Sequence, residues 1–198
     1  MKTIVLRVGE MDTNCYLAVC PETKKCLIID PGDEANLISE TIIFQKLSPV
    51  AIVATHGHFD HILSAGELQL AFEIPFLIHQ EDEKIVDYMN RSAQWWLKRE
   101  IVEQSPKIDS FLEDGQVVEF GQEKLTVLST PGHSPGGICL FNSSQKILFS
   151  GDTLFKNGVG RTDLPYSSSS DLEKSLKLIW KQFAGYQVYP GHEGQFRL

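Results

Sequence analysis

The chain has 198 residues, of which 42% are hydrophobic and 22% are charged. These values are ordinary for a globular protein; they suit a single domain over 1–198 that buries a substantial core without disulfide bonds. The formal net charge of −8 argues against a nucleic-acid partner, because phosphate binding needs clustered positive charge. A small anionic molecule stays open as a partner, since bound metal ions would change the local field.

Cysteine usage and hydropathy indicate the compartment. Four cysteines lie at positions 15, 20, 26 and 139 without a Cys-x-x-Cys pair, which is typical of reduced, buried thiols. No disulfide is expected between Cys20 and Cys26. The apolar run in "MKTIVLRVGE" is too short for a signal peptide, and no stretch is long enough to span a membrane. We therefore expect a cytoplasmic protein without a membrane partner.

Short apolar and β-branched runs recur between Gly, Pro and Asn residues. In chain order they predict strands at "TIVLRV", "NCYLAVC", "CLIID", "VAIVAT", "PFLIH", "VVEF", "KLTVLST", "GICLFN", "KILFS" and "YQVYP". Helical periodicity predicts helices over 34–47, 61–72, 80–104 and 171–183. Ser170 and Glu173 have the spacing of a capping box at the start of the last helix. This mixture of elements predicts an α/β domain with two sheet layers.

Four of the apolar runs end in the same way, with glycine beside a side chain that can bind metal: "VATHGH", "LSTPGH", "LFSGD" and "VYPGH". Glycine lets the backbone turn sharply and approach closely where a strand stops. If these strands lie side by side, their ends share one edge and the side chains converge there.

This pattern supplies seven candidate metal ligands: His56, His58, Asp60, His61, His133, Asp152 and His192. A catalytic zinc needs about three protein ligands and a structural one about four, so seven suit two ions with a bridging carboxylate. His56 and His58 are two residues apart and can point the same way from extended backbone, whereas Asp60 and His61 start a helical stretch. Such residues taken singly are more often capping or surface groups. That reading does not explain five of six histidines at strand ends beside glycine.

The motifs "THGHFDH", "TPGHSPGG", "SGDTLF" and "YPGH" resemble, in order and spacing, those of the metallo-β-lactamase superfamily. The resemblance is to its short glyoxalase II-like members, the hydroxyacylglutathione hydrolases and their relatives, and it extends from "NCYLAV" and "IIDPGD" to the C-terminus. It implies an αββα sandwich with two metals at one edge of the paired sheets. It further implies that the first metal is held by His56, His58 and His133, the second by Asp60, His61 and His192, and that Asp152 bridges them. Asp30, in "IIDPGD", is interpreted as turn-forming structure near the site and not as a ligand.

Two divalent ions at such a site would activate water. A zinc-bound water has its pKa lowered from 15.7 to about 7, which gives a metal-bound hydroxide as the nucleophile at neutral pH. Imidazole and carboxylate suit zinc, the first choice here, as well as iron or manganese. A thiolate leaves without protonation, and His79, the one remaining histidine, is assigned to a strand-to-helix turn. We therefore predict hydrolysis of a small thioester, with a glutathione thioester as the expected substrate and Asp60 and Asp152 in catalytic roles.

The resemblance leaves other functions on the same fold open. A β-lactamase is disfavoured because antibiotic-hydrolysing members lack an aspartate equivalent to Asp152, and a nuclease because basic surfaces are not evident. "GRTD" also resembles persulfide dioxygenases, in which His56, His133 and Asp152 would hold one iron; this is the alternative hypothesis. A metal-binding domain with little activity is the third, because Glu193 stands where glycine is expected and the chain ends soon afterwards.

Two further features concern the substrate. Arg161 either contacts an anionic group of the substrate or pairs with Asp163 and fixes its own loop. Tyr88, Trp95 and Trp96 lie in the segment 80–104, which could cover the substrate cleft or form the contact of a homodimer. Packing against their own domain is the commoner fate of aromatic residues on a helix, and it is the interpretation preferred here.

Overall fold

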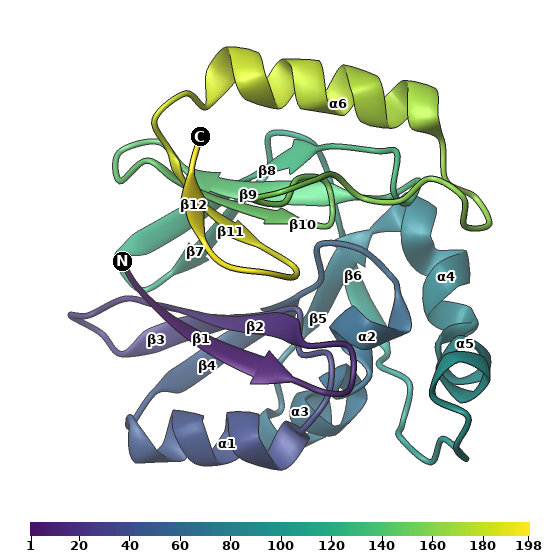
Figure 1. Cartoon of the computed structure of the whole chain (residues 1–198). Coiled ribbons are helices and arrows are strands. Elements are labelled where there is room, and N and C mark those ends of the chain that lie inside the picture. Colours follow the sequence, from purple (N-terminus) through teal and green to yellow (C-terminus); the bar gives the residue numbers. More distant parts are fainter.

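The structure is a computed structural model that describes all 198 residues. It contains two six-stranded sheets that face each other (Figure 1). The first sheet takes its strands in chain order: β1 (Lys2–Val8), β2 (Thr13–Val19), β3 (Lys25–Ile29), β4 (Ser48–Val53), β5 (Phe76–His79) and β6 (Ile108–Leu112). The strands β1 to β3 are antiparallel, and β3 to β6 are parallel.

The second sheet is formed by the rest of the chain. Its strands are β7 (Val117–Phe120), β8 (Glu123–Ser129), β9 (Ile138–Asn142), β10 (Ile147–Gly151), β11 (Gln187–Pro190) and β12 (Phe196–Arg197), which also lie in chain order. All neighbours are antiparallel except β10 and β11. Each sheet is therefore built from one continuous half of the chain.

Helices cover the outer faces of both sheets (Figure 1). Near the first sheet lie α1 (Ala35–Phe44), α2 (Phe59–Ile62) and α3 (Ala65–Phe72), and over the second lies α6 (Ser169–Gln182). The short helices η1 (Gln80–Asp82), α4 (Glu83–Asp87) and α5 (Met89–Leu97) lie at the side of the molecule. The buried apolar side chains of α6 recur at helical spacing on the face toward the sheet: Leu172, Leu176 and Ile179.

Three apolar clusters separate these layers. One of 22 buried residues lies between the first sheet and its helices, and one of nine lies between the second sheet and α6. The middle cluster of 15 residues joins Leu27 and Val53 of the first sheet to Leu140 and Phe149 of the second. Alternating side chains of a strand serve opposite faces of a sheet, so both sheets are buried on both sides. The predicted αββα sandwich is confirmed.

All ten predicted strands are present. Two further strands, β6 and β12, were not predicted, and their sequence patterns are the weakest. Most of β6 is exposed or half-buried because it is the outermost strand of its sheet, and β12 is two residues long. Neither segment shows the alternation or the apolar run from which strands are recognised.

The predicted helices needed more correction. The single helix predicted over 80–104 is three short ones, and the prediction is wrong beyond Leu97, where Lys98 has a left-handed φ of 55° that ends α5. The helix predicted over 61–72 is divided into α2 and α3. The cap of α6 is Ser168, whose hydroxyl accepts a hydrogen bond from the Asp171 N–H at 3.3 Å, and not the predicted Ser170.

The cysteines agree with the prediction of free, buried thiols. Cys20 belongs to the cluster between the sheets and Cys26 to the cluster under the helices, so these two side chains lie on opposite faces of the first sheet. No helix combines the length and the apolar character that crossing a membrane requires.

Candidate metal centre

Side chains that follow four strands meet at one edge of the sandwich. Those of the segment 55–61 follow β4 of the first sheet, while His133, Asp152 and His192 follow β8, β10 and β11 of the second. The four strands are not neighbours in one sheet, because β4 belongs to the first sheet and the other three belong to the second. Their ends nevertheless converge, since the two sheets face each other.

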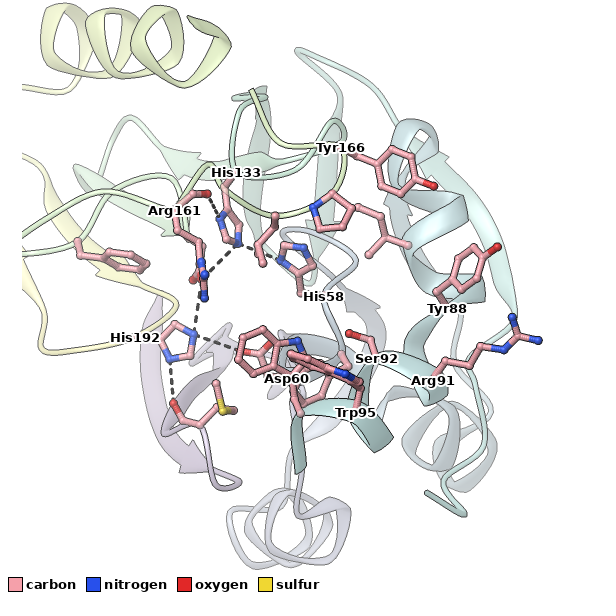
Figure 2. A pocket seen from close by; sticks show the side chains of 18 of the residues that line it. His58, Asp60, Tyr88, Arg91, Ser92, Trp95, His133, Arg161, Tyr166 and His192 are labelled. Atoms are coloured by element: carbon pink, nitrogen blue, oxygen red, sulfur yellow. Dashed lines mark hydrogen bonds and ion pairs between the residues drawn. The ribbon is translucent and has the colours of Figure 1, made fainter. Parts of the chain in front are cut away.

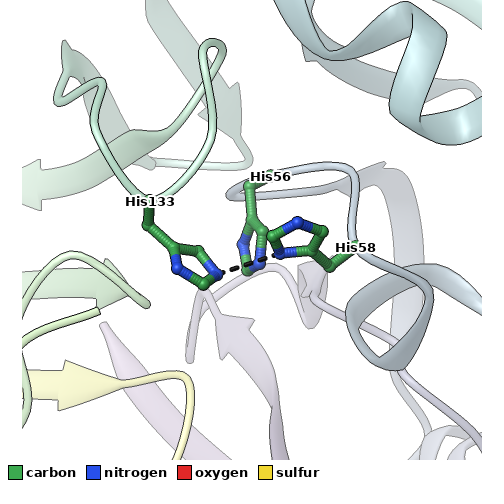
Figure 3. A group of neighbouring side chains, drawn as sticks. All are labelled: His56, His58 and His133. Atoms are coloured by element: carbon green, nitrogen blue, oxygen red, sulfur yellow. Dashed lines mark hydrogen bonds between the residues drawn. The ribbon is translucent and has the colours of Figure 1, made fainter. Parts of the chain in front are cut away.

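The structure brings all seven candidate residues together. Their ligand atoms form three groups within which all atoms lie within 4.8 Å of one another: His56, His58 and His133; His56, His61 and Asp152; Asp60, His61 and His192. Figure 3 shows the first group, in which His58 Nδ1 lies 2.9 Å from His133 Nε2. The first and third groups have the same members as the two ligand sets expected from the sequence.

Four of the imidazoles use Nδ1 outside the cluster and turn Nε2 inward. The partners of Nδ1 are Thr55 Oγ1 for His56 (3.1 Å), Asp30 Oδ2 for His61 (3.0 Å), the Arg161 carbonyl for His133 (2.9 Å) and the Met11 carbonyl for His192 (3.1 Å). An oxygen acceptor on one ring nitrogen fixes the tautomer and the orientation of the other, which is the usual arrangement of histidines that bind metal. His58 differs, because its Nδ1 faces the cluster.

Asp30 is the centre of this outer support. Its buried carboxylate accepts from the Thr55 N–H and from Thr55 Oγ1, both at 2.7 Å, and from His61 Nδ1. Its φ of 53° places it at a turn, as expected, and it belongs to none of the three donor groups. Asp30 therefore positions His61 directly and His56 through Thr55, a role that was not predicted from the sequence.

Asp152 lies between the two outer groups. Its Oδ1 is 3.4 Å from His61 Nε2, and its Oδ2 is 3.6 Å from His133 Nε2 and 3.5 Å from His192 Nε2. Gly191 makes this approach feasible, because a Cβ on it would lie 2.1 Å from Asp152 Oδ1. Glycine at this strand end therefore has a steric reason.

Two atoms of the cluster test whether these residues fit a cation. His56 Nε2 and Asp152 Oδ1 are buried and have no hydrogen-bond partner, since the 3.4 Å contact of Oδ1 with His61 is an ion pair without hydrogen-bond geometry. A buried polar atom without a partner costs about 1–3 kcal/mol. A cation in contact with both would remove this cost, so the donor set fits a metal.

The pKa values in the cluster are moved apart. Burial, with the neighbouring imidazoles, lowers the pKa of His56, and the same causes lower that of His58 to about 4. Burial works against ionisation of His61, but Asp152 and Asp60 outweigh it and raise its pKa. Burial likewise opposes charge on both aspartates, yet the imidazoles, His61 first, lower the pKa of Asp60 and of Asp152. Ionised carboxylates beside imidazoles are the donors that divalent cations need.

Asp82 holds two of the loops that carry the donors, a role that was not predicted from the sequence. Its fully buried carboxylate accepts from the Gly57 N–H (2.8 Å), from Ser134 Oγ (2.8 Å) and from the Gly136 N–H (2.6 Å). It thereby joins the loop that carries His56 and His58 to the loop that carries His133. Burial raises the pKa of Asp82, although its three donors oppose this. One acid among several in "QEDE" cannot be singled out by pattern.

The loop of His192 is held by β2. Asn14 Nδ2 donates to the carbonyls of Pro190 and Glu193, both at 2.9 Å, and the Tyr16 hydroxyl donates to the Pro190 carbonyl at 2.6 Å. Glu193 has a left-handed φ of 67°, which explains why glycine is expected there. The sequence predicted the "NCY" segment as part of a strand and of the resemblance, but not these contacts with the His192 loop.

A cavity of about 900 Å³ opens over the cluster (Figure 2). His58, Asp60, His133, Asp152 and His192 form its floor, and aromatic residues form much of its wall. Tyr88, Trp95 and Trp96 line this cavity and are 50%, 62% and 40% exposed, so the expectation that they pack against their own domain is wrong. His79 has the predicted turn role, because its Nδ1 accepts from the Glu81 N–H at the start of η1.

Arg161 also lines the cavity, and its side chain is paired. Nε and Nη2 donate to the two carboxylate oxygens of Asp163, both at 2.7 Å. The guanidinium carbon lies 5.7 Å from the centre of the Trp96 ring. Two roles were predicted for Arg161. The structure confirms the pairing with Asp163 within the loop, and contact with a substrate stays a prediction.

Comparison with known proteins agrees with this geometry. The family model of the metallo-β-lactamase superfamily matches residues 8–192. Hydroxyacylglutathione hydrolase GloC of Haemophilus influenzae is 30% identical over 184 residues, which cover 89% of this chain and 83% of that protein. The crystal structure of BLEG-1 B3 metallo-β-lactamase is similar with a TM-score of 0.90 and 29% identity, over 99% of this chain and 94% of that one.

The structure of TTHA1623 in a di-iron-bound form is similar with a TM-score of 0.88 and 32% identity, over 98% of this chain and 94% of that one. The family match covers most of the chain, and the donor residues lie where the motifs place them. The chain belongs to the metallo-β-lactamase superfamily, as a glyoxalase II-like member.

Proposed function

We propose that this protein is a dinuclear metal-dependent hydrolase of small thioesters, with glutathione thioesters as its substrate class. One observation carries the proposal. Two groups of three donors lie at the same edge of the sandwich. Asp152 lies between them, with one oxygen toward His61 and the other toward His133 and His192. This is the arrangement that two ions sharing one carboxylate would require.

His56, His58 and His133 would hold one cation, Asp60, His61 and His192 the other, and Asp152 would contact both. Two bound divalent cations would supply a water nucleophile at neutral pH and stabilise the charge that develops on the thioester carbonyl oxygen. Zinc is our first choice, and iron or manganese suits the same donors. The di-iron form of TTHA1623 supports two iron ions as an alternative.

The residues of the chain have their own parts in the reaction. Asp60, an ionised carboxylate on the cavity floor, would hold the second cation through Oδ2, the oxygen that faces His61 and His192. Asp30 and the carbonyls of Arg161 and Met11 hold three imidazoles in orientation. A thiol has a pKa of about 8.5, so the thiolate leaves without an acid. An amide nitrogen would need one.

Metal quantification paired with a hydrolysis assay tests the proposal. We expect about two metal equivalents per chain and hydrolysis of S-lactoylglutathione. One iron per chain with oxygen consumption on glutathione persulfide would support the dioxygenase instead. A β-lactam belongs in the substrate panel, because the name of BLEG-1 states that activity for a similar structure. Metal-replete protein that cleaves none of these compounds would support a binding domain with little activity.

A variant links the metals to the activity. Asp152→Ala should lose metal and hydrolysis together, because the carboxylate between the two groups is removed. Asp87→Ala is the control, since Asp87 is exposed on α4 and its side chain makes no hydrogen bond or ion pair. An Asp152→Ala protein that keeps both metals and full activity would contradict the bridging role.

A further inference from the structure

The cavity above the donor cluster is larger than a small hydroxyacyl group requires. Its volume of about 900 Å³ lies near the top of the range of roughly 300–1,000 Å³ that accommodates drug-sized ligands. Ten of its 20 lining residues are hydrophobic. The cavity is continuous with the donor cluster, because five of the seven donors form its floor. A substrate whose thioester lies at the floor therefore has its remaining groups against this wall.

Two tryptophans on one helix supply the flattest apolar part of the wall. Trp95 and Trp96 of α5 are 62% and 40% exposed, and their rings meet edge to face with centres 4.9 Å apart. Met89 and Ala93 anchor α5 in the core beneath them. Trp95 lines the same cavity as the donor Asp60 (Figure 2). Exposed indoles in a cavity favour a ligand with an aromatic surface, which they contact at little cost in entropy.

The charges of the wall point in the same direction. The guanidinium of Arg161 is neutralised by Asp163, so Arg161 adds little net charge beside Trp96. The side chain of Arg91 extends away from the imidazoles in Figure 2. Lys98 Nζ lies 4.3 Å from the centre of the Trp95 ring, but Lys98 does not line the cavity. The lining of the wall beside the floor is therefore apolar rather than cationic.

We propose that this wall binds the acyl group of the substrate and selects an aromatic acyl group over a small aliphatic one. The inference rests on the proposed function and deepens it. In the reaction, water adds its oxygen to the acyl carbon, the carbon–sulfur bond breaks, and the products are an aryl-substituted carboxylate and a free thiol. Trp95 and Trp96 act by positioning the acyl group and take no part in proton transfer.

Two thioesters of glutathione form a matched pair for the test. S-Mandeloylglutathione and S-lactoylglutathione differ only by a phenyl group in place of a methyl group on the same carbon. We expect kcat/KM to be at least about tenfold higher for the mandeloyl compound, because even one added methylene group in a hydrophobic pocket is worth about 10–200-fold. A ratio at or below one would overturn the inference while leaving the proposed function intact.

Variants of the three tryptophans locate the selectivity. Trp95→Ala and Trp96→Ala should move the mandeloyl-to-lactoyl ratio toward one. Trp180→Ala is the matched control, because Trp180 is 53% exposed on α6 and does not line the cavity. It should leave the ratio unchanged. All three side chains are largely outside the core, and circular dichroism would verify that each variant is folded. An unchanged ratio in both cavity variants would contradict the assignment.

Binding without turnover separates the two proposals. S-Benzylglutathione and S-methylglutathione are thioethers that cannot be hydrolysed, and calorimetry with metal-loaded protein would compare their affinities. Tighter binding of the benzyl compound, lost in Trp95→Ala and kept in Trp180→Ala, would support the aromatic wall even if neither thioester were cleaved. Equal affinities would overturn it even for an active hydrolase.

Discussion

Asp82 offers the sharpest test of how the metal centre is supported. Asp82→Ala removes the acceptor of three buried donors: the Gly57 N–H, the Gly136 N–H and the Ser134 hydroxyl. The hydroxyl can rotate toward another acceptor, but the two N–H groups cannot, and each unsatisfied one costs about 1–3 kcal/mol. Removing a carboxylate whose burial is itself unfavourable returns part of this cost. We therefore expect a loss of about 2–4 kcal/mol in the free energy of unfolding. This is a large share of the total, which is roughly 5–15 kcal/mol for a native protein.

Urea unfolding of metal-free protein would measure this loss without a contribution from bound metal. Titration against a chelator would then show metal affinity reduced by about 10–100-fold, the usual effect of disturbing the groups behind the ligands. Asp82→Asn keeps one acceptor oxygen and should lose less stability, and Asp87→Ala should lose almost none. If the free energy of unfolding of Asp82→Ala lay within about 0.5 kcal/mol of the parent value, and the variant bound both metals equally well, Asp82 would not be a support of the site.

Three further changes probe other parts of the centre. Gly191→Ala would place a Cβ 2.1 Å from Asp152 Oδ1; metal analysis should show a reduced content, and two retained equivalents would mean that the loop adapts. Asp30→Asn should weaken metal binding by about 10–100-fold in a chelator titration, because His61 loses a charged acceptor; an unchanged affinity would contradict this. The pKa of His58 is lowered to about 4 in the folded, metal-free protein. In the unfolded chain this imidazole binds its proton near pH 6.5, whereas in the folded protein it stays neutral down to about pH 4. Stability should fall as the pH drops between these values. His58→Gln should lessen that fall by up to about 3 kcal/mol, and identical urea curves at pH 7 and pH 5 in both proteins would refute it.

The sequence was a good guide where local pattern and structure coincide. The runs that became β8, β10 and β11 are apolar and end at glycine, so both the strands and the position of their last side chains could be predicted. The sandwich followed from the resemblance and from the mixture of elements, and the structure confirms it. Local pattern could not predict that β4 lies in the other sheet from β8, β10 and β11, because the sequence of a strand does not indicate which distant strand it pairs with.

The supports of the site were harder to foresee than the donors. Asp30, Asp82 and Asn14 act through contacts with residues at least 25 positions away, and nothing in their own surroundings distinguishes them from ordinary turn or surface residues. The aromatic segment was misread for a related reason. Periodicity over 80–104 predicts one amphipathic helix, but Tyr88 and Lys98 interrupt it, and the short helix α5 turns Trp95 and Trp96 toward the cavity.

The two sheets are consecutive halves of the chain, and the seven donors are divided between them, four on one side and three on the other. A pair of ions at this seam would act as a clasp between two units that are otherwise joined by the turn at 113–116 and by the apolar layer between them. Chelation should then loosen the docking of one half on the other before it unravels either sheet. Amide exchange would show this as early loss of protection along the seam, with the strand centres still closed.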